Sequence, residues 1–406
     1  MQKEQIMAGL LLVVFINFVG IGALIPILPF TVVDQLGYSE SVMTLLLASF
    51  SLAMFIGNPI LGRLSDKLGR KRILIASISV ATAAHFWFAV SEDITTLFMS
   101  RILAGFGAGN IGVIHAIIAD NSERQDRARM MGLMGACIGA GFVLGPALGG
   151  LLAGIGNGPA HQMPFLVAGI FSAISLIMAF RLPESYPSNA DAKQVKTSFF
   201  ARVTALMSGP LGLFAAAFFL LNLSFAQVEA AYVLVVRDLL GFGTRETGWL
   251  FTYIGICIIF VQGGLIGRIV PRFGEMRVIR AGIYCLITGQ LVTVMLATLF
   301  ADGGALLMHI LVATSFVCIG FALTNPTLSA ASSAASRRDE MGGALGLVQG
   351  FGSLGQVIGL TAAGPLYLSG GAGLSFSFAA LISVCLLITL FFIARVWPKL
   401  SPSVAS

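Results

Sequence analysis

One arginine and one acid stand well inside long apolar runs of this sequence, where their types could do chemistry. Arg101 lies in FMSRILAGFGAG, residues 98–109, and Glu229 lies in the apolar run 210–236. A charge held in a hydrocarbon environment is costly unless it is compensated. A carboxyl group can also bind and release a proton as its surroundings change. These two residues, with Asp34 at the end of another run, are the candidates for proton coupling.

The run that contains Glu229 has a mixed chemical character. If the run is helical, its residues Asn222, Phe225, Glu229 and Tyr232 share one face, because their spacing follows the helical period. An amide, an aromatic ring, a carboxylate and a phenol on one face suit a cavity that binds an amphipathic solute. His115 falls on the helical face of the intramembrane arginine and joins the predicted substrate cavity.

Composition indicates that membrane-spanning helices position these residues. Of 406 residues, 57% are hydrophobic and 10% are charged, whereas about a quarter of the residues in soluble domains are charged. Twelve apolar runs have the length that spans a bilayer as a helix. None shows the alternation typical of a membrane barrel strand. The runs lie at 6–33, 41–63, 73–91, 95–118, 130–153, 163–181, 210–236, 247–267, 277–299, 305–330, 342–365 and 373–397.

The basic residues predict how the chain lies in the membrane. All but three of the 24 lysine and arginine residues fall in the terminal and alternate connecting segments that share one side; the exceptions are Arg101, Arg237 and Arg245. Because basic residues concentrate in cytoplasmic loops, we expect both termini in the cytoplasm, in a bacterial-type cytoplasmic (inner) membrane. The net charge of +6 then reflects membrane topology rather than nucleic-acid binding.

Charge is concentrated in GRLSDKLGRKR, residues 62–72, between two apolar runs. Asp66 stands among five bases and can accept hydrogen bonds from them. Gly62 and Gly69 permit tight backbone geometry. A weaker copy, GRIVPRFGEMR, occupies residues 267–277, with proline in the place of the aspartate. Bases alone would satisfy a simple membrane anchor, so we expect a further role for the first copy.

The two copies belong to an internal repeat. The charged segments are 205 residues apart, and glycines of the fifth and eleventh runs align at an offset of 214. Repeated six-helix halves around a midplane site are a transporter architecture. We predict an N-terminal six-helix bundle at 1–182, a cytoplasmic linker at 183–207 and a C-terminal six-helix bundle at 208–406.

The fifth run, with GAGFVLGPALGG at residues 139–150, combines small residues with a helix breaker. Gly141, Gly145 and Gly149 recur every four residues and form a strip that another helix can approach closely. Pro146 removes a backbone donor and is expected to bend the helix. Together with Gly150, these residues are candidates for a hinge or a seal.

These segments resemble those of a known family. GRLSDKLGRKRIL is similar to the signature loop of the major facilitator superfamily, FMSRILAGFGAG resembles its fourth-helix motif, and GAGFVLGPALGG resembles the antiporter motif of its drug-efflux branches. GIGALIPILP and NPTLSA are similar to segments of twelve-span drug:proton antiporters, especially tetracycline-efflux proteins. The resemblance implies an all-α integral membrane fold, with twelve transmembrane helices in two pseudo-symmetric six-helix bundles.

The resemblance also implies roles for individual residues. The charged segment would be a cytoplasmic gate, in which Asp66 holds the two halves together when the protein opens outward. The gate residues are Gly62, Asp66, Gly69, Arg70 and Arg72. The fifth run would carry the antiporter motif, and Arg101 would act in proton relay or substrate binding.

One position departs from the tetracycline-efflux pattern. In INFVGIG, residues 16–22, Asn17 stands where those proteins carry a first-helix aspartate. An amide cannot titrate, so coupling must use another group, with Glu229 first and Asp34 next. Asn17 itself is assigned to the predicted substrate cavity.

The leading hypothesis is a secondary transporter that exports a lipophilic or amphipathic small molecule in exchange for protons, by alternating access. The alternative is a major facilitator carrier of another kind: an uptake symporter, a facilitator, or a lipid or metabolite exporter. A receptor would not explain the paired charged segments. No GxxxxGK[ST] phosphate loop supports ATP-driven transport, and no nucleophile–base or metal constellation supports an intramembrane enzyme.

Few partners are expected besides the substrate, protons and lipid. The five cysteines all lie in apolar runs, and their odd number is no disulfide framework. We expect a monomer without cofactor, metal or nucleic-acid partner.

The expected topology can be tested by labelling. In a background without native cysteines, Ser188→Cys and Ser403→Cys should resist a membrane-impermeant thiol reagent applied to intact cells, because the linker and C-terminus face inward. Labelling of either site before the cells are broken would reverse the orientation.

Overall fold

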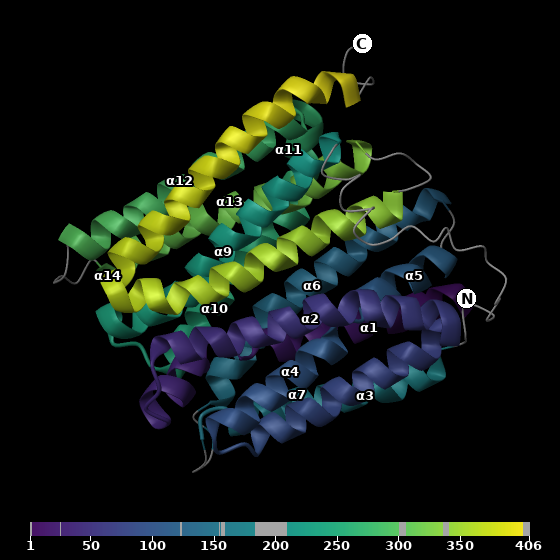
Figure 1. Cartoon of the computed structure of the whole chain (residues 1–406), viewed down its shortest axis with the longest axis horizontal. Helices are drawn as coiled ribbons and strands as arrows, with labels where there is room; N and C mark the ends of the chain where they lie inside the picture. The colour runs from purple at the N-terminus through teal and green to yellow at the C-terminus, as the bar shows by residue number, and fades with distance from the viewer. Residues whose placement is uncertain are drawn as a thin grey trace. The chain divides into compact units, whose positions relative to one another are not determined.

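The computed structural model describes residues 2–24, 26–121, 124–153, 155, 159–182, 209–299, 306–335 and 341–400. These residues form helices joined by turns, with no β strand among them (Figure 1). The elements are α1 (Gln2–Gly22), η1 (Pro29–Gln35), α2 (Glu40–Leu68), α3 (Arg70–Ala89), α4 (Ile94–Ala108), α5 (Ile111–Asn121), α6 (Arg124–Leu152), α7 (Gln162–Arg181), α9 (Pro210–Leu240), α10 (Thr244–Ile259), η2 (Phe260–Leu265), α11 (Ile266–Phe273), α12 (Glu275–Leu299), α13 (Leu306–Ala335) and α14 (Met341–Leu400). The expected all-α class is confirmed.

The helices follow the apolar runs of the sequence. Nine helical segments of the described chain are long and apolar enough to cross a membrane, and the shorter apolar helices Met7–Gly20 and Cys137–Leu152 coincide with the first and fifth runs. Helix α14 (Met341–Leu400) contains two predicted runs, and it leaves helical geometry between them at Gly370 and Gly371. Each run therefore has a helical counterpart, while twelve membrane crossings stay a prediction.

The fourth run is a broken helix whose two parts are held by side-chain amides. Helix α4 ends at Ala108 and α5 begins at Ile111. The Oδ1 atom of Asn58 accepts a hydrogen bond of 3.0 Å from the backbone N–H of Gly112, and Asn110 donates to Ser77 Oγ at 3.0 Å. A break inside a bilayer is tolerated where such groups satisfy the freed backbone.

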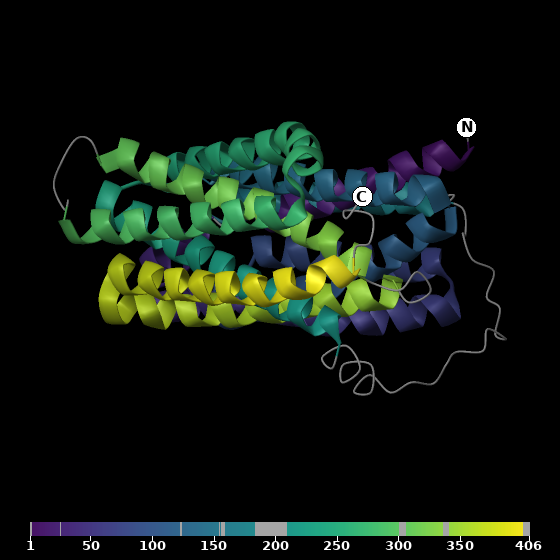
Figure 2. The same cartoon turned by 90° about the horizontal axis from the view of Figure 1, so that it is seen from above.

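The chain divides into two compact units. Unit 1 comprises residues 1–193 and 236–256, and unit 2 comprises residues 194–235 and 257–406. In unit 1, α1 packs on α6 and α7, and α3 packs on α4 and α7. In unit 2, α12 contacts α13 and α14, as Figure 2 also shows. The predicted linker at 183–207 lies outside the described residues. The limits expected for the two six-helix bundles, 1–182 and 208–406, remain a prediction.

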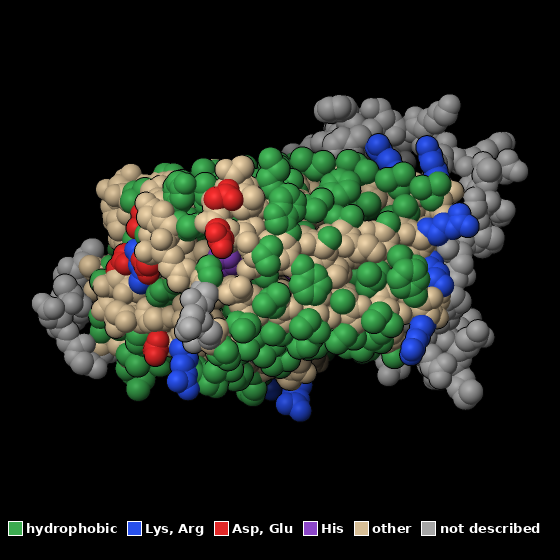
Figure 3. Space-filling view, turned by 90° about the horizontal axis from the view of Figure 1, so that it is seen from below, with side chains coloured by type: hydrophobic (Ala, Val, Ile, Leu, Met, Phe, Trp, Pro, Cys, Tyr) green, Lys and Arg blue, Asp and Glu red, His purple; other side chains and the backbone are tan. Residues whose placement is uncertain are grey.

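Large apolar side chains cover much of the surface. Ile56, Phe180 and Leu381 are among the exposed examples. In the face drawn in Figure 3, hydrophobic side chains form a broad area, and charged side chains lie mostly outside it. Such a surface suits lipid, where every backbone N–H and C=O group must be satisfied within the protein and helices meet this need.

Glycines let the helices approach each other closely, and they do so in the same way in both units. A Cβ atom at Gly107 of α4 would lie 2.7 Å from Ser77 O and 2.9 Å from Ala81 N of α3. A Cβ atom at Gly320 of α13 would lie 2.6 Å from both Gly282 O and Leu286 N of α12. Ser77 and Ala81 each lie 205 residues before their counterparts, Gly282 and Leu286, which is also the distance between the two charged segments. The packing therefore repeats with the sequence.

A second pair of helix contacts is also repeated. On α6, a Cβ atom at Gly145 would lie 2.6 Å from Val19 O of α1. On α14, a Cβ atom at Gly359 would lie 2.4 Å from Leu223 O of α9. The glycine strip predicted in the fifth run therefore faces α1, and its counterpart in the eleventh run faces α9.

The repeated packing predicts where an added methyl group is harmful. Gly107→Ala and Gly320→Ala should each destabilise the protein by about 1–3 kcal/mol, because the new Cβ atom overlaps a neighbouring backbone. Thermal unfolding of the purified protein in detergent measures this loss.

Gly62→Ala and Gly267→Ala are the matched controls, because no neighbouring atom lies within 4 Å of a Cβ atom at either position. Alanine favours a helix over glycine, so the controls should be neutral or slightly stabilised. Equal stability of Gly107→Ala and Gly62→Ala would contradict the close contact.

Candidate functional site

Glu229 lies on a partly exposed face of α9. Asn222, Phe225 and Glu229 are partly exposed, while most of their neighbours on this helix are buried. Their spacing of three and four residues places them on one side. Among the described residues, no basic side chain forms an ion pair with Glu229. The carboxylate is therefore available to a proton or to a solute.

The other two residues of this face have neighbours within unit 2. Asn222 donates from Nδ2 to Phe218 O at 2.9 Å, one turn earlier in α9. The ring of Phe225 stacks on Phe321 of α13, with centroids 3.8 Å apart and an interplanar angle of 18°. Carboxylate, amide and stacked rings thus lie along one side of α9, as the sequence predicts for these three positions.

Tyr232 takes a different position. Its side chain is buried, and its hydroxyl lies 2.6 Å from Thr314 Oγ1 of α13, within hydrogen-bonding distance. A phenol hydroxyl in an apolar interior needs such a partner. The structure therefore does not bring Tyr232 onto the partly exposed face of Glu229, although helical spacing predicts it there.

A buried polar network in unit 2 was missed by the sequence analysis. Gln227 of α9 donates to Ser375 Oγ at 2.7 Å, and Gln290 of α12 donates to Ser224 Oγ at 2.9 Å. Ser224 and Ser383 also share a hydrogen bond of 2.8 Å. Two uncharged polar residues three apart in the apolar run of α9 are the signal that could have revealed it. Because the network satisfies most of its own groups, it holds α9, α12 and α14 together.

Arg101 is buried in unit 1 among aromatic rings. It is 1% exposed, and its guanidinium carbon lies 4.3 Å, 4.6 Å and 5.7 Å from the ring centroids of Phe88, Phe165 and Phe50. These distances fit cation–π attraction. Its Nε and Nη2 atoms have no hydrogen-bond partner among the described residues. Aromatic faces, rather than an acid, surround this charge.

Two histidines, His85 and His161, lie near these rings. His161 Nε2 lies 2.9 Å from Ser91 O, and its ring meets Phe88 edge-on. Burial lowers the pKa of His161, which favours its neutral ring. His85 is buried beside Phe165. The side chain of His115 lies outside the described part of the structure.

Asn17 and Asp34 differ in their surroundings. Asn17 of α1 is buried within unit 1. Asp34 of η1 is 47% exposed, and its Oδ1 atom lies 3.4 Å from Arg237 Nη1. Asp34 therefore sits at the surface with a cationic partner, whereas Glu229 has no ion-pair partner in the described part of the chain.

The charged segment 62–72 is mostly helical rather than a loop. Helix α2 continues to Leu68, and α3 begins at Arg70. Only Gly69 breaks the helix, with φ +99°, and Gly274 in the second copy has φ +78°. Both values favour glycine. Gly62 lies inside α2 with open space around it, so the tight geometry predicted there is required only at Gly69.

Within this segment, Asp66 forms an ion pair with Arg70 across the break. Arg70 also donates to Ser65 Oγ at 2.8 Å. Arg72 is exposed. The acid is thus held beside the turn, with one carboxylate and one guanidinium fixing the junction of α2 and α3.

The predicted antiporter motif lies on α6, which continues through Pro146 as an α-helix. Gly141, Gly145 and Gly149 face the first helix and the turn after it. Gly150 meets another partner: a Cβ atom there would lie 2.5 Å from Gly248 Cα of α10. Within unit 1, the backbone of α1 with its following turn and the backbone of α10 therefore both pack closely against the motif on α6.

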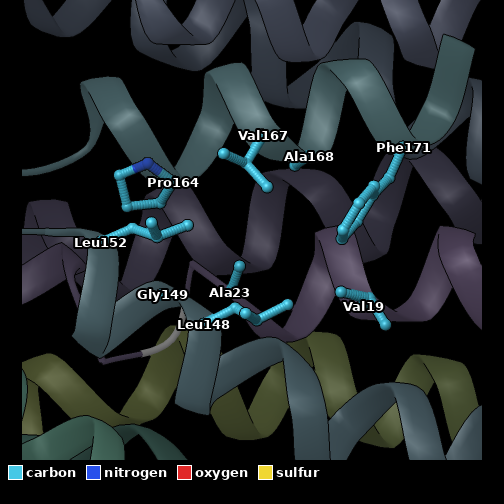
Figure 4. Close-up of a pocket in the computed structure, with 9 residues that line it drawn as sticks. All are labelled: Val19, Ala23, Leu148, Gly149, Leu152, Pro164, Val167, Ala168 and Phe171. Atoms are coloured by element: carbon cyan, nitrogen blue, oxygen red, sulfur yellow. The ribbon is translucent and has the colours of Figure 1, made fainter.

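Beside the motif is a small apolar pocket formed by α1, α6 and α7 (Figure 4). Its lining residues are Val19, Ala23, Leu148, Gly149, Leu152, Pro164, Val167, Ala168 and Phe171. The labelled aliphatic and aromatic side chains converge on one space in the close-up. With no polar side chain in the lining, this pocket suits only an apolar group.

Metal ligands are not gathered in the described chain: it contains no group of three or more His, Cys, Asp or Glu residues that could hold a metal ion. Cys137, Cys257, Cys285, Cys318 and Cys385 are all free thiols.

Comparison with known proteins identifies the family. The Major Facilitator Superfamily description matches residues 10–359. Multidrug resistance protein 1 of Bacillus subtilis is 32% identical over 375 residues, covering 90% of this chain and 91% of that protein. Quinolone resistance protein NorA of Staphylococcus aureus strain MRSA252 is 32% identical over 361 residues, covering 87% of this chain and 88% of NorA.

Solved structures share the fold. The human organic anion transporter MFSD10 has a TM-score of 0.71 at 21% identity, with 96% of this chain and 100% of that chain covered. The nucleoside transporter NupG has a TM-score of 0.78 at 15% identity, with 96% and 99% covered. The resemblance drawn from the sequence motifs is confirmed, and the chain belongs to the Major Facilitator Superfamily of multi-pass membrane transporters, which are not enzymes.

Proposed function

We propose that the protein is a proton-coupled secondary transporter that exports lipophilic or amphipathic small molecules by alternating access. Family membership and similarity to multidrug and quinolone resistance proteins over most of the chain support this class. The observation that carries the proposal is the carboxylate of Glu229, which has no ion-pair partner among the described residues, on a face with an amide and a stacked pair of aromatic rings.

The chemistry of this face favours a particular kind of solute. Glu229 attracts a cationic group, while Phe225 and Phe321 offer a flat apolar surface. Asn222 can add a hydrogen bond to a polar substituent. We therefore propose amphipathic cations as the preferred substrates, and quinolones as a further class to screen because of the named relative.

Coupling follows from competition for one carboxylate. A proton and a cationic substrate each neutralise Glu229, so binding of one weakens binding of the other. Such reciprocal coupling is the thermodynamic requirement for exchange. Arg101, a fixed positive charge among aromatic rings of unit 1, is the candidate for proton relay, and Asp34 is the second candidate for the proton.

Alternating access needs closures at both ends. We propose Asp66, with its turn at Gly69 and its partner Arg70, as part of the cytoplasmic closure. The antiporter motif on α6 would seal the path through its close contacts with the first helix and α10. The protein would act as a monomer in the bacterial cytoplasmic membrane, with both termini in the cytoplasm.

Removing the titratable group should uncouple transport. Glu229→Gln keeps the side-chain shape but cannot exchange a proton. Proton-driven uptake of an amphipathic cation into inverted vesicles should fall to the level of vesicles without the protein, because the group that exchanges the proton is gone. Binding should persist, but its dependence on pH should largely disappear.

Glu92→Gln is the matched control, because Glu92 is an exposed acid outside the spanning helices. It should transport normally. If Glu229→Gln still concentrates the cation against its gradient with protons, another residue carries the proton, and Asp34→Asn is the next variant. If the wild-type protein equilibrates substrate without moving protons, the alternative of a facilitator is supported.

The inner closure can be tested separately. Asp66→Asn removes the charged partner of Arg70, and because the Asp66 side chain is 41% exposed, an ion pair at this i,i+4 spacing contributes only about 0.3–0.5 kcal/mol. The population should therefore shift toward the inward-open state by roughly twofold. Spin labels at Leu68 and Phe273, both exposed, would report the change as longer distances.

Glu275→Gln is the control for this experiment, because it removes an acid from the second copy of the segment, where proline stands in the place of Asp66. Unchanged distances and full transport in Asp66→Asn would exclude Asp66 from the closure.

A further inference from the structure

Arg237, near the end of α9, binds three carboxylates at once. Its Nη1 atom lies 3.4 Å from Asp34 Oδ1, its Nη2 atom 3.2 Å from Glu40 Oε1, and its Nε atom 2.8 Å from Asp238 Oδ1. Every nitrogen of the guanidinium is therefore used. The side chains of Arg237 and Glu40 are each only 16% exposed, which limits screening of this pair by water.

The partners come from distant parts of the sequence. Asp34 belongs to η1 and Glu40 to the first turn of α2, about 200 residues before the arginine. The contacts lie inside unit 1, because residues 236–256 are part of that unit. They therefore join the end of the seventh predicted span to the first two.

The cluster breaks the internal repeat in an informative way. Asp34 stands three residues before Gly37, with φ +71°, and Asp238 stands three residues before Gly241, with φ +63°. The acid and the turn are thus repeated, but the base occurs only in the second copy. One guanidinium serves both repeated acids.

Charge balance makes the contact depend on this single base. With Arg237, three negative charges surround one positive charge and are held by charge-assisted hydrogen bonds. Without it, three carboxylates would stand close together and repel one another. Removing the arginine therefore changes an attraction into a repulsion.

A second contact fixes the same segment. Gly248 of α10 touches Gly150 of α6 so closely that a Cβ atom at Gly248 would lie 2.6 Å from Gly150 Cα. A segment from the second half of the sequence, 236–256, is thus attached to the first half by ion pairs and by backbone packing.

We propose that Arg237 is a positioning residue for transport: its ion pairs with Asp34 and Glu40 close the outer end of the transport path. They must break each time the protein opens outward. This inference rests on the proposed alternating access. It assigns a charged closure to the outer end of the transport path, in addition to the cytoplasmic closure proposed around Asp66.

The test measures outer accessibility in the full-length protein without its native cysteines. Thr247→Cys is the reporter, because Thr247 of α10 is fully buried and cysteine is of similar size. A membrane-impermeant maleimide applied from outside should label it slowly. Adding Arg237→Ala should raise the labelling rate by roughly tenfold or more.

Arg245→Ala is the matched control, because Arg245 is an exposed arginine on α10 in the same segment and forms no ion pair among the described residues. It should leave the labelling rate unchanged. Arg237→Lys, which keeps the charge but cannot bind three acids in the same geometry, should give an intermediate rate.

A charge exchange separates an ion-pair closure from a general packing effect. Arg237→Glu alone should label rapidly, and Arg237→Glu combined with Glu40→Arg should return toward the slow rate, because one base again faces three acids. A folded Arg237→Ala variant that labels like Arg245→Ala would overturn the proposal. So would a charge-exchanged protein that labels as fast as Arg237→Glu.

The result is independent of the proposed substrate and of proton coupling, because labelling needs neither a transported solute nor a pH gradient. Loss of proton-driven transport in wild-type vesicles would contradict the proposed function and leave the labelling comparison intact. Rapid labelling of the wild-type reporter itself would contradict the closure.

Discussion

The need to satisfy every polar group within hydrocarbon dominates this structure. Helices satisfy the backbone internally, so the chain can hold a surface of exposed apolar side chains against lipid. Lipid is as apolar as a leucine, so helices gain little by burying large side chains and instead associate through close backbone contact. The glycines at 107, 145, 320 and 359 provide that contact in both units. Their repetition shows that the duplication preserved the points of closest approach between helices.

The same constraint explains why the two intramembrane charges lie in different surroundings. The guanidinium of Arg101 is weakly hydrated and planar, and three aromatic faces can partly compensate it in a fully buried position. A carboxylate has no such compensation from ring faces, whose quadrupole is negative. Glu229 remains partly exposed instead. A fixed cation can therefore be enclosed by packing, while a group that must exchange a proton or a solute has to stay accessible.

The sequence predicts features that depend on local pattern, and it fails where distant segments meet. Length and hydropathy locate the helices, and the repeat locates the turns at Gly69 and Gly274. Helical spacing places Asn222 and Phe225 on the face of Glu229, but it cannot reveal that Thr314 draws Tyr232 into the interior. The rings around Arg101 come from α2, α3 and α7. No periodicity within α4 carries that information, because each ring is supplied by another helix.

Asymmetry within the duplication has a physical consequence for a carrier. Because the two halves are parallel repeats, identical halves would contribute the same side chains to each closure, and both halves would hold that closure with the same charges. Here the charged segment has its aspartate only in the first copy, while the acid before the turns at Gly37 and Gly241 is repeated and its arginine occurs only in the second copy. Asp66 is paired within its own segment, whereas Arg237 binds acids from two other elements. Under the proposed alternating access, the pairs of Arg237 with Asp34 and Glu40 break on opening, whereas Asp66 acts through the junction of α2 and α3 that it fixes. The energy barrier to opening is therefore expected to depend on different charges at the two ends, which allows substrate and proton to bias one closure without equally biasing the other.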